Sequence, residues 1–179
     1  MPHRIALFLF ASFTAVLGVA LPAWPAEVDV LDYRAPVPDH WIAGRPASSM
    51  RLLQYRITGK AGDARFIVYY FGPGQGGSTA VNVARWRSQF TAADGGPVTP
   101  ALETYTVNGW PVTLARFAGS YARGVGSGPQ GRAVPDQALT AAVIETPQGA
   151  VIAQLFGPAQ TVRDNEAAYR AFVSGIRQR

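Results

Sequence analysis

Residues 65–90 read Arg-Phe-Ile-Val-Tyr-Tyr-Phe-Gly-Pro-Gly-Gln-Gly-Gly-Ser-Thr-Ala-Val-Asn-Val-Ala-Arg-Trp-Arg-Ser-Gln-Phe. The first part, residues 66–71, is an unbroken apolar run that leads into a glycine-rich turn over residues 72–77. Because the run is apolar at every position rather than at alternate ones, it predicts a strand that is covered on both faces. A strand, a tight turn and a helix in this order predict a layered core of sheet and helices. The stretch indicates no reaction.

A helix is predicted over residues 78–91. Ser78 is a favourable N-cap, because its hydroxyl accepts a hydrogen bond from a free backbone N–H of the first turn, which is worth about 1 kcal/mol. Val83, Trp86 and Phe90 recur at helical spacing and predict a stripe that packs on the sheet. A run of Asp, Gly, Gly and Pro shortly after this stripe ends the helix.

The remaining segments alternate between strand and turn patterns. Asn108-Gly109 is a strong hairpin signal because both residues tolerate positive φ, and Pro147-Gln148-Gly149 marks a second hairpin. A glycine-rich segment over 119–137 separates the two hairpins, and loops of that length in a compact domain are often functional. The predicted strands cover residues 27–33, 49–58, 66–71, 102–107, 111–117, 138–145 and 150–156, and a proline-rich segment over 35–39 is expected to run extended.

A second helix is predicted over residues 161–177. Thr161 and Asp164 form a capping pair at its start. Apolar residues at helical spacing predict its buried face: Val162, Tyr169, Phe172, Val173 and Ile176. Together these segments predict the α+β class, a single-domain antiparallel β-sheet of about six or seven strands flanked by two helices in an α/β/α sandwich.

The N-terminus has the layout of a secretory signal peptide. A basic residue near the start precedes an apolar stretch that ends among small residues at Ala20, Ala23 and Ala26. We expect residues 1–26 to be a cleaved signal peptide and residues 27–179 to form a single α/β domain. An uncleaved anchor is the alternative, because a membrane span needs only about 20 apolar residues. The expected location is the periplasm or the exterior.

The composition limits the chemistry. The chain has 16 basic residues, 11 acidic residues, two histidines and no cysteine, with a formal net charge of +5. Disulfide and thiolate chemistry are therefore closed to it, and it lacks the usual ligand set of a transition-metal site. Arg85, Trp86 and Arg87 point about 100° apart on a helix, so they do not form a flat platform for nucleic acid. We expect no metal, cofactor or nucleic acid, and membrane contact only through an uncleaved leader.

The glycine turn raises a second possibility. Gly72, Gly74 and Gly77 match the pattern G-x-G-x-x-G between a strand and a helix, and the loop 72–78 also resembles a phosphate-binding loop without its lysine. The next predicted strands form an antiparallel hairpin rather than a parallel crossover, which favours a simple tight turn.

His40 is the only histidine outside the predicted leader. A nucleophile–base pair would need it, together with Ser48, Ser49 or Ser78. The alternative function is therefore a small envelope hydrolase, or a phosphate- or nucleotide-binding enzyme that uses the loop 72–78. A lone histidine in a proline-rich segment is more often a packing residue, so we assign no catalytic residue.

Polar residues on one face of the predicted 78–91 helix are the best candidates for a contact surface. They recur at helical spacing beside the glycine turn, and arginines of the 119–137 segment extend the set. A merely solvated helix face is the plainer interpretation. The candidate binding surface consists of Gln75, Gly76, Asn82, Arg85, Gln89, Arg123 and Arg132.

Residues 71–90 resemble a signature of uncharacterised secreted bacterial proteins, F-G-x-G-Q-G-G-S followed by N-x-x-R-W-x-x-Q-F. The order of elements is similar to the PsbP-like fold, which has an N-terminal segment with a Pro-x-x-Trp turn (here Pro38 to Trp41), an antiparallel sheet, a mid-chain helix and a closing helix. That fold is shared by an extrinsic photosystem II subunit and a Ran-binding import factor. The resemblance implies a secreted or periplasmic, non-enzymatic binding or assembly protein, whose partner is a protein or a small ligand of the envelope.

Overall fold

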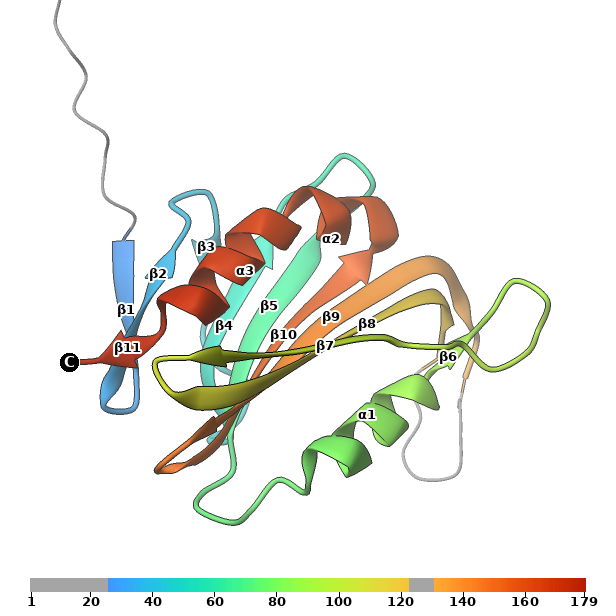
Figure 1. Ribbon diagram of the computed structural model, residues 1–179. Coiled ribbons are helices and arrows are strands. Elements are labelled where there is room, and N and C mark those ends of the chain that lie inside the picture. The colour runs from blue at the N-terminus through green and yellow to red at the C-terminus, as the bar shows by residue number, and fades with distance from the viewer. Residues whose placement is uncertain (1–25, 123–130) are drawn as a thin grey trace, which may run out of the picture.

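The computed structural model describes residues 26–122 and 131–179, which are built around an eight-stranded sheet (Figure 1). The strand order is β3-β4-β5-β10-β9-β8-β6, β7 also pairs with β8, and every pairing is antiparallel. The predicted antiparallel sheet is confirmed, with more strands than expected. The strands are β3 (Ile42–Ala43), β4 (Arg51–Ile57), β5 (Ala64–Tyr70), β6 (Phe90–Thr91), β7 (Ala101–Val107), β8 (Trp110–Tyr121), β9 (Val134–Thr146) and β10 (Gly149–Pro158).

Both predicted hairpins form. Asn108 and Gly109 adopt φ values of 50° and 83° and join β7 to β8, and the turn before Gly149 joins β9 to β10. β8 and β9 extend past the predicted ends, so the glycine-rich segment between them is shorter than the predicted 119–137. Part of that segment, including Arg123, lies outside the described residues.

The apolar run over residues 66–71 provides most of β5, which lies between β4 and β10. Phe66 and Val68 point into one core and are fully buried, while Ile67 between them is 8% exposed on the other face. All three side chains are buried although they lie on different faces of the sheet, which explains the lack of alternation at these positions.

The helix after the glycine turn is shorter than predicted. It is α1 (Thr79–Arg87), and the hydroxyl of Ser78 caps it by accepting a hydrogen bond from the Val81 N–H at 3.3 Å. The chain leaves the helix at Ser88, so Phe90 lies in β6 rather than in the helical stripe. Of that stripe, Trp86 is the buried helical member, and α1 packs through a narrow contact.

The predicted C-terminal helix is two helices, α2 (Ala159–Asp164) and α3 (Glu166–Gly175), with a break at Asn165. The predicted cap is wrong, because Thr161 lies inside α2 and its hydroxyl donates to the Gly62 carbonyl at 2.8 Å. The predicted buried face is confirmed: Val162, Tyr169, Phe172, Val173 and Ile176 are all buried.

The N-terminal segment forms a hairpin instead of one edge strand over 27–33. The chain reverses at Leu31, which has φ 57°, between β1 (Ala26–Val30) and β2 (Tyr33–Val37). β11 (Arg177–Gln178) adds to β2 and completes a three-stranded sheet in the order β1-β2-β11. The proline-rich segment is extended as predicted, because it provides most of β2.

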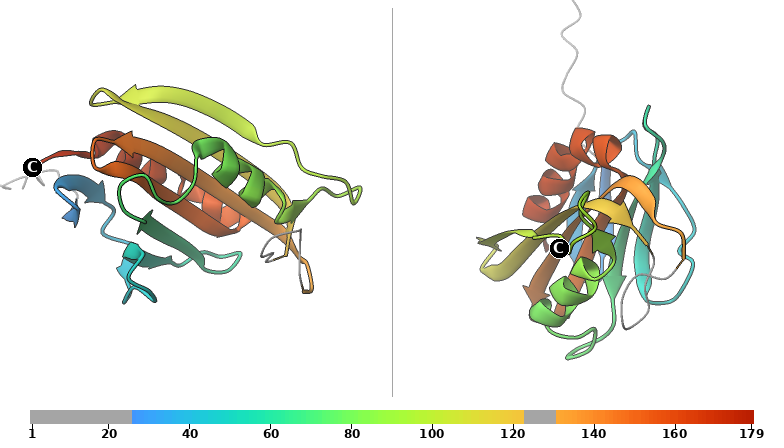
Figure 2. Two further views of the ribbon diagram at one scale, coloured as in Figure 1. Left: turned by 90° about the horizontal axis from the view of Figure 1, so that it is seen from below. Right: turned by 90° about the vertical axis from the view of Figure 1, so that its right-hand side faces the viewer.

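The main sheet lies between helices (Figures 1 and 2). α2 and α3 lie against one face, where Tyr169 and Phe172 pack with Phe66, and α1 lies against the opposite face with Trp86. Among the described residues, the predicted two-helix sandwich is therefore corrected to three helices and an added small sheet. No helix within residues 26–122 or 131–179 is long and apolar enough to cross a membrane.

Candidate functional site

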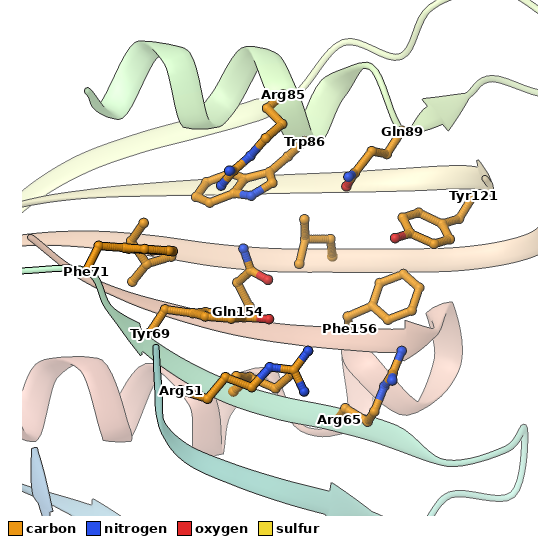
Figure 3. A pocket seen from close by; sticks show the side chains of 13 residues that line it. Arg51, Arg65, Tyr69, Phe71, Arg85, Trp86, Gln89, Tyr121, Gln154 and Phe156 are labelled. Atoms are coloured by element: carbon orange, nitrogen blue, oxygen red, sulfur yellow. The ribbon is translucent and has the colours of Figure 1, made fainter. Parts of the chain in front are cut away.

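The face of the sheet that carries α1 is only partly covered. Trp86 and Phe90 pack over buried residues of β8, β9 and β10, such as Phe117, Leu139 and Ile152, but that cluster contains no buried residue of β4 or β5. The uncovered part forms a cleft of about 450 Å³ between α1 and the sheet. We call it the arginine cleft. It is lined by Arg51, Arg65, Ile67, Tyr69, Phe71, Arg85, Trp86, Gln89, Tyr121, Leu139, Ile152, Gln154 and Phe156 (Figure 3).

The alternation of side chains along β5 and β10 places the residues of the cleft floor on one face of the sheet. Ile67 of β5 lies opposite Gln154 of β10, with Arg65 opposite Phe156 and Tyr69 opposite Ile152. Successive side chains of a strand point to opposite faces, so these residues share the α1 face while their neighbours enter the other core. Much of the floor therefore comes from alternate positions of β5 and β10.

Three arginines give the cleft its charge. The Arg51 guanidinium donates to the Gln54 side chain at 2.8 Å and lies 5.7 Å from the centre of the Tyr69 ring. The Arg65 guanidinium lies 5.8 Å from the centre of the Phe156 ring. None of Arg51, Arg65 and Arg85 forms an ion pair within the part of the chain that the structure describes, and no described lining residue is acidic.

Aromatic rings supply flat apolar surface in the cleft. Tyr69 and Phe71 are stacked with ring centres 6.1 Å apart, and Tyr121 and Phe156 lie 4.5 Å apart in a tilted pair. All four side chains are half-buried. Half-buried rings beside cations suit a ligand that joins an acidic group to a flat or apolar body.

The predicted binding surface is divided by the structure. Arg85 and Gln89 line the arginine cleft, whereas Gln75 and Gly76 belong to the glycine turn and Arg132 is exposed elsewhere. Asn82 is 1% exposed, which contradicts its predicted place on an open surface.

Asn82 holds the glycine turn and Arg85 together. Its amide nitrogen donates to the carbonyls of Gly76, Gly77 and Ser78 at 2.9, 3.3 and 3.1 Å. Its oxygen accepts from the Arg85 guanidinium at 2.6 Å. Of the polar residues predicted on this helix face, Asn82 therefore has a structural role, and Arg85 lines the cleft.

The glycine turn has a structural explanation. Gly76 has φ 87°, and a Cβ there would meet the Phe71 ring at 2.8 Å. The chain after α1 enters β6, which is antiparallel to β8, so the parallel crossover of a dinucleotide site is missing. The turn also directs three carbonyls at Asn82, whereas a phosphate cradle presents N–H groups.

His40 and the candidate serines are not brought together. The His40 Nε2 atom lies 3.0 Å from the Asn165 side-chain oxygen, at the junction of α2 and α3. The Trp41 indole donates to the same oxygen at 3.1 Å. Ser78 caps α1 on the opposite face of the sheet, and Ser48 and Ser49 are exposed before β4. In the described ranges, no three His, Cys, Asp or Glu side chains gather as a metal site.

Sequence reasoning missed most of the cleft, including Arg51, Arg65, Gln154 and Phe156. A weak signal was present, because Arg65 and Gln154 are polar residues at the edge or middle of apolar strands. Their convergence depends on the pairing of β5 with β10, which no local pattern specifies.

The architecture defines the class of this protein as PsbP-like in fold. No family model and no curated protein sequence matches the chain. The solution structure of the cyanobacterial PsbP protein (CyanoP) from Synechocystis sp. PCC 6803 is similar with a TM-score of 0.53 and 12% sequence identity, over 93% of this chain and 98% of that one. A crystal structure of PA94, a protein of unknown function from Pseudomonas aeruginosa, is similar with a TM-score of 0.48 and 17% identity, over 86% and 96%.

The comparison with PsbP concerns the fold alone. The PsbP-like architecture expected from the order of elements is confirmed. The secreted-family signature over residues 71–90 stays a prediction, and its residues have local roles in the turn, the α1 cap and the cleft wall.

Proposed function

We propose that the protein is a secreted or periplasmic, non-enzymatic binding protein that holds an acidic ligand in the arginine cleft. The observation that carries the proposal is the set of three arginines around one cleft that has no acidic lining residue among those described. Like charges gathered without counter-charges create a positive potential that attracts anions. A volume of about 450 Å³ is typical of a small-molecule site.

A binding role fits the cleft better than a catalytic one. Its described lining contains no His, Ser, Cys or carboxylate to serve as nucleophile or general base. The PsbP-like fold is compatible with a binding or assembly role. The alternative, a hydrolase or nucleotide-binding enzyme at the loop 72–78, has less support, because Asn82 occupies that turn and His40 contacts Asn165 instead.

The proposed location rests on the predicted leader over residues 1–26. The partner in this proposal is a small ligand of the envelope, with no role for nucleic acid or metal. Mass spectrometry of the exported protein tests the location: a mature N-terminus near residue 27 supports it, and retention of residues 1–20 favours the anchored alternative.

A thermal-shift screen tests the binding site. The protein is expressed from the full 179-residue chain and heated with panels of carboxylates, phosphates, neutral sugars and amines. A ligand at 100 times its dissociation constant stabilises the native state by about 2.7 kcal/mol, which raises the melting temperature by about 5–10 °C. We expect hits among the acids, and we expect Arg85→Ala to reduce their thermal shifts.

Arg163→Ala is a matched control. Arg163 is an exposed arginine on α2 that donates to the Gln160 oxygen three residues earlier at 2.6 Å, as Arg85 donates to that of Asn82. It lies away from the cleft lining, so its loss should leave the hits unchanged. Acid hits whose thermal shifts are unchanged in Arg85→Ala, or no acid hits at all, would contradict the proposed function.

A further inference from the structure

The arginines of the cleft stand on two sides of it. Arg85 projects from α1, whereas Arg51 and Arg65 come from β4 and β5 (Figure 3). Gln154 of β10 lies between these sides on the floor, in register with Ile67. A ligand with one acidic group would satisfy one side and leave the guanidinium charge on the other side without a partner.

The floor between the two sides is suited to a flat body. Tyr69 and Phe156 present half-buried rings on neighbouring strands, and the Gln154 amide offers both a donor and an acceptor. A ring of the ligand can stack on these aromatic surfaces, and the Gln154 amide can add a hydrogen bond to the ligand beside them.

The two charged sides are held in place before a ligand arrives. The buried Asn82 accepts from Arg85 at 2.6 Å and is itself fixed by three backbone carbonyls. Gln54 accepts from Arg51 at 2.8 Å. Guanidinium groups that are already oriented lose less conformational freedom on binding, which favours planar recognition of a carboxylate or phosphate.

We infer that the ligand is a diacid, in which two carboxylate or phosphate groups are separated by a ring body with an apolar face. One acidic group meets Arg85 on α1, and the other meets Arg51 and Arg65 on the sheet. This inference rests on the proposed function and adds the ligand class to it. An aromatic diacid and an acidic disaccharide share this chemistry, so the test includes both.

Calorimetric titration with matched probes tests the inference. The aromatic pair is naphthalene-2,6-dicarboxylate and 2-naphthoate, which have the same ring body and differ by one carboxylate. The saccharide pair is digalacturonate and its monomethyl ester, which also differ by one carboxylate. A hydrogen-bonded charged contact is worth about ten- to a hundredfold in affinity, so we expect the diacid of at least one pair to bind tighter by that factor.

The variants assign the two acidic groups to the two sides. Arg85→Ala should reduce the diacid to the affinity of the monoacid, and Arg65→Gln should weaken it from the opposite side. Arg163→Ala should keep the full difference. The pair whose diacid binds more tightly than its partner shows whether the ligand is an aromatic diacid or an acidic disaccharide.

Two results would overturn the inference, and they differ in their meaning for the proposed function. Equal affinity for diacid and monoacid, lost in Arg85→Ala, would exclude the bridging ligand but keep an acidic site in the cleft. Failure of all four probes, together with an acid panel that gives no thermal shift, would exclude both.

Discussion

The two faces of the main sheet differ in how completely they are covered. On one face, α2, α3 and the β1–β2 hairpin bury Tyr169, Phe172 and Ile176 completely. On the other face, the short helix α1 buries Trp86 and leaves Tyr69 half-buried in the arginine cleft. We infer that the face covered by α2 and α3, the closed face, provides most of the stability. The face under α1, the open face, is then available for binding.

The arginines of the two faces differ in the same way. On the α3 side, Arg116 donates to Glu166 at 2.6 Å and to Glu103 at 3.1 Å, and Arg170 also pairs with Glu103 at 2.6 Å. In the cleft, the arginines contact aromatic rings and amides instead. Charge on the closed face is internally neutralised, and charge on the open face is available to a ligand.

The largest contrast is expected from truncating one phenylalanine on each face. Phe172 is fully buried and meets Phe66 edge to face with ring centres 4.7 Å apart, so Phe172→Ala should cost about 3–5 kcal/mol. Phe156 is half-buried, so Phe156→Ala should cost about 1 kcal/mol. Urea unfolding measures both. Equal losses would show that the cleft floor is as important for stability as the closed core.

The next contrast concerns Asn82, whose hydrogen bonds connect the glycine turn with Arg85 beside the cleft. Asn82→Ala removes the side-chain donor of the Gly76 and Gly77 carbonyls, while the Ser78 carbonyl keeps the residue 82 backbone N–H, and should lower the free energy of unfolding by about 1–3 kcal/mol. Gln160→Ala is the control, because Gln160 makes the corresponding contact to Arg163 but is exposed, and it should change stability by less than about 0.5 kcal/mol. Similar values for the two variants would remove the structural role of Asn82.

The buried Tyr169 of the closed face should make the free energy of unfolding fall at alkaline pH. Burial raises the pKa of Tyr169 well above 10, and its hydroxyl donates to the Ala153 carbonyl at 2.9 Å. Below pH 10 the tyrosine is protonated in both states; above it the unfolded chain releases the proton first, so stability falls by up to about 1.4 kcal/mol per pH unit.

Tyr169→Phe isolates that contribution. The variant removes the buried hydroxyl, so its unfolding free energy should fall less between pH 9 and pH 11 than that of the native chain. Burial also raises the pKa values of Tyr55 and Tyr105, which leaves a smaller residual slope in the same direction. Parallel pH profiles for variant and native chain would contradict the assignment. Chemical denaturation at each pH provides the measurement.

The smallest contrast is between arginines. Arg116→Met leaves Glu166 and Glu103 with fewer cationic partners on the closed face and should cost about 1 kcal/mol. Arg65→Met removes a cation that has no ion pair among the described residues, so stability should change by less than about 0.5 kcal/mol. The difference in stability loss between the two variants should shrink in 1 M salt, because the Debye length is then about 3 Å. A larger loss for Arg65→Met would reverse the comparison.

Local signals in the sequence predicted much of the fold. Asn108-Gly109 fixed one hairpin, Ser78 marked the start of α1, and the apolar spacing of 162–176 identified the closed face. The errors fall where tertiary contacts overrule local patterns. The helix predicted to reach residue 91 ends at Arg87, and this early exit allows Phe90 to pair with Tyr121 of β8.

The same limit applies to the candidate site. Arg85 and Gln89 were found because they recur with Asn82 at helical spacing in the sequence. Arg51, Arg65 and Phe156 were missed, since they lie on three strands and meet only through the pairings of β4, β5 and β10. Local sequence therefore predicts one wall of the cleft, and the sheet register supplies the other.

The most direct test of the difference between the faces uses two tryptophans as reporters. Trp86 lines the arginine cleft, whereas the Trp41 indole N–H is bonded to Asn165 in the closed face. In a nitrogen–proton correlation spectrum titrated with naphthalene-2,6-dicarboxylate, we predict that the Trp86 indole signal moves while the Trp41 signal stays. Movement of Trp41 alone, or of neither signal, would contradict the assignment of binding to the open face.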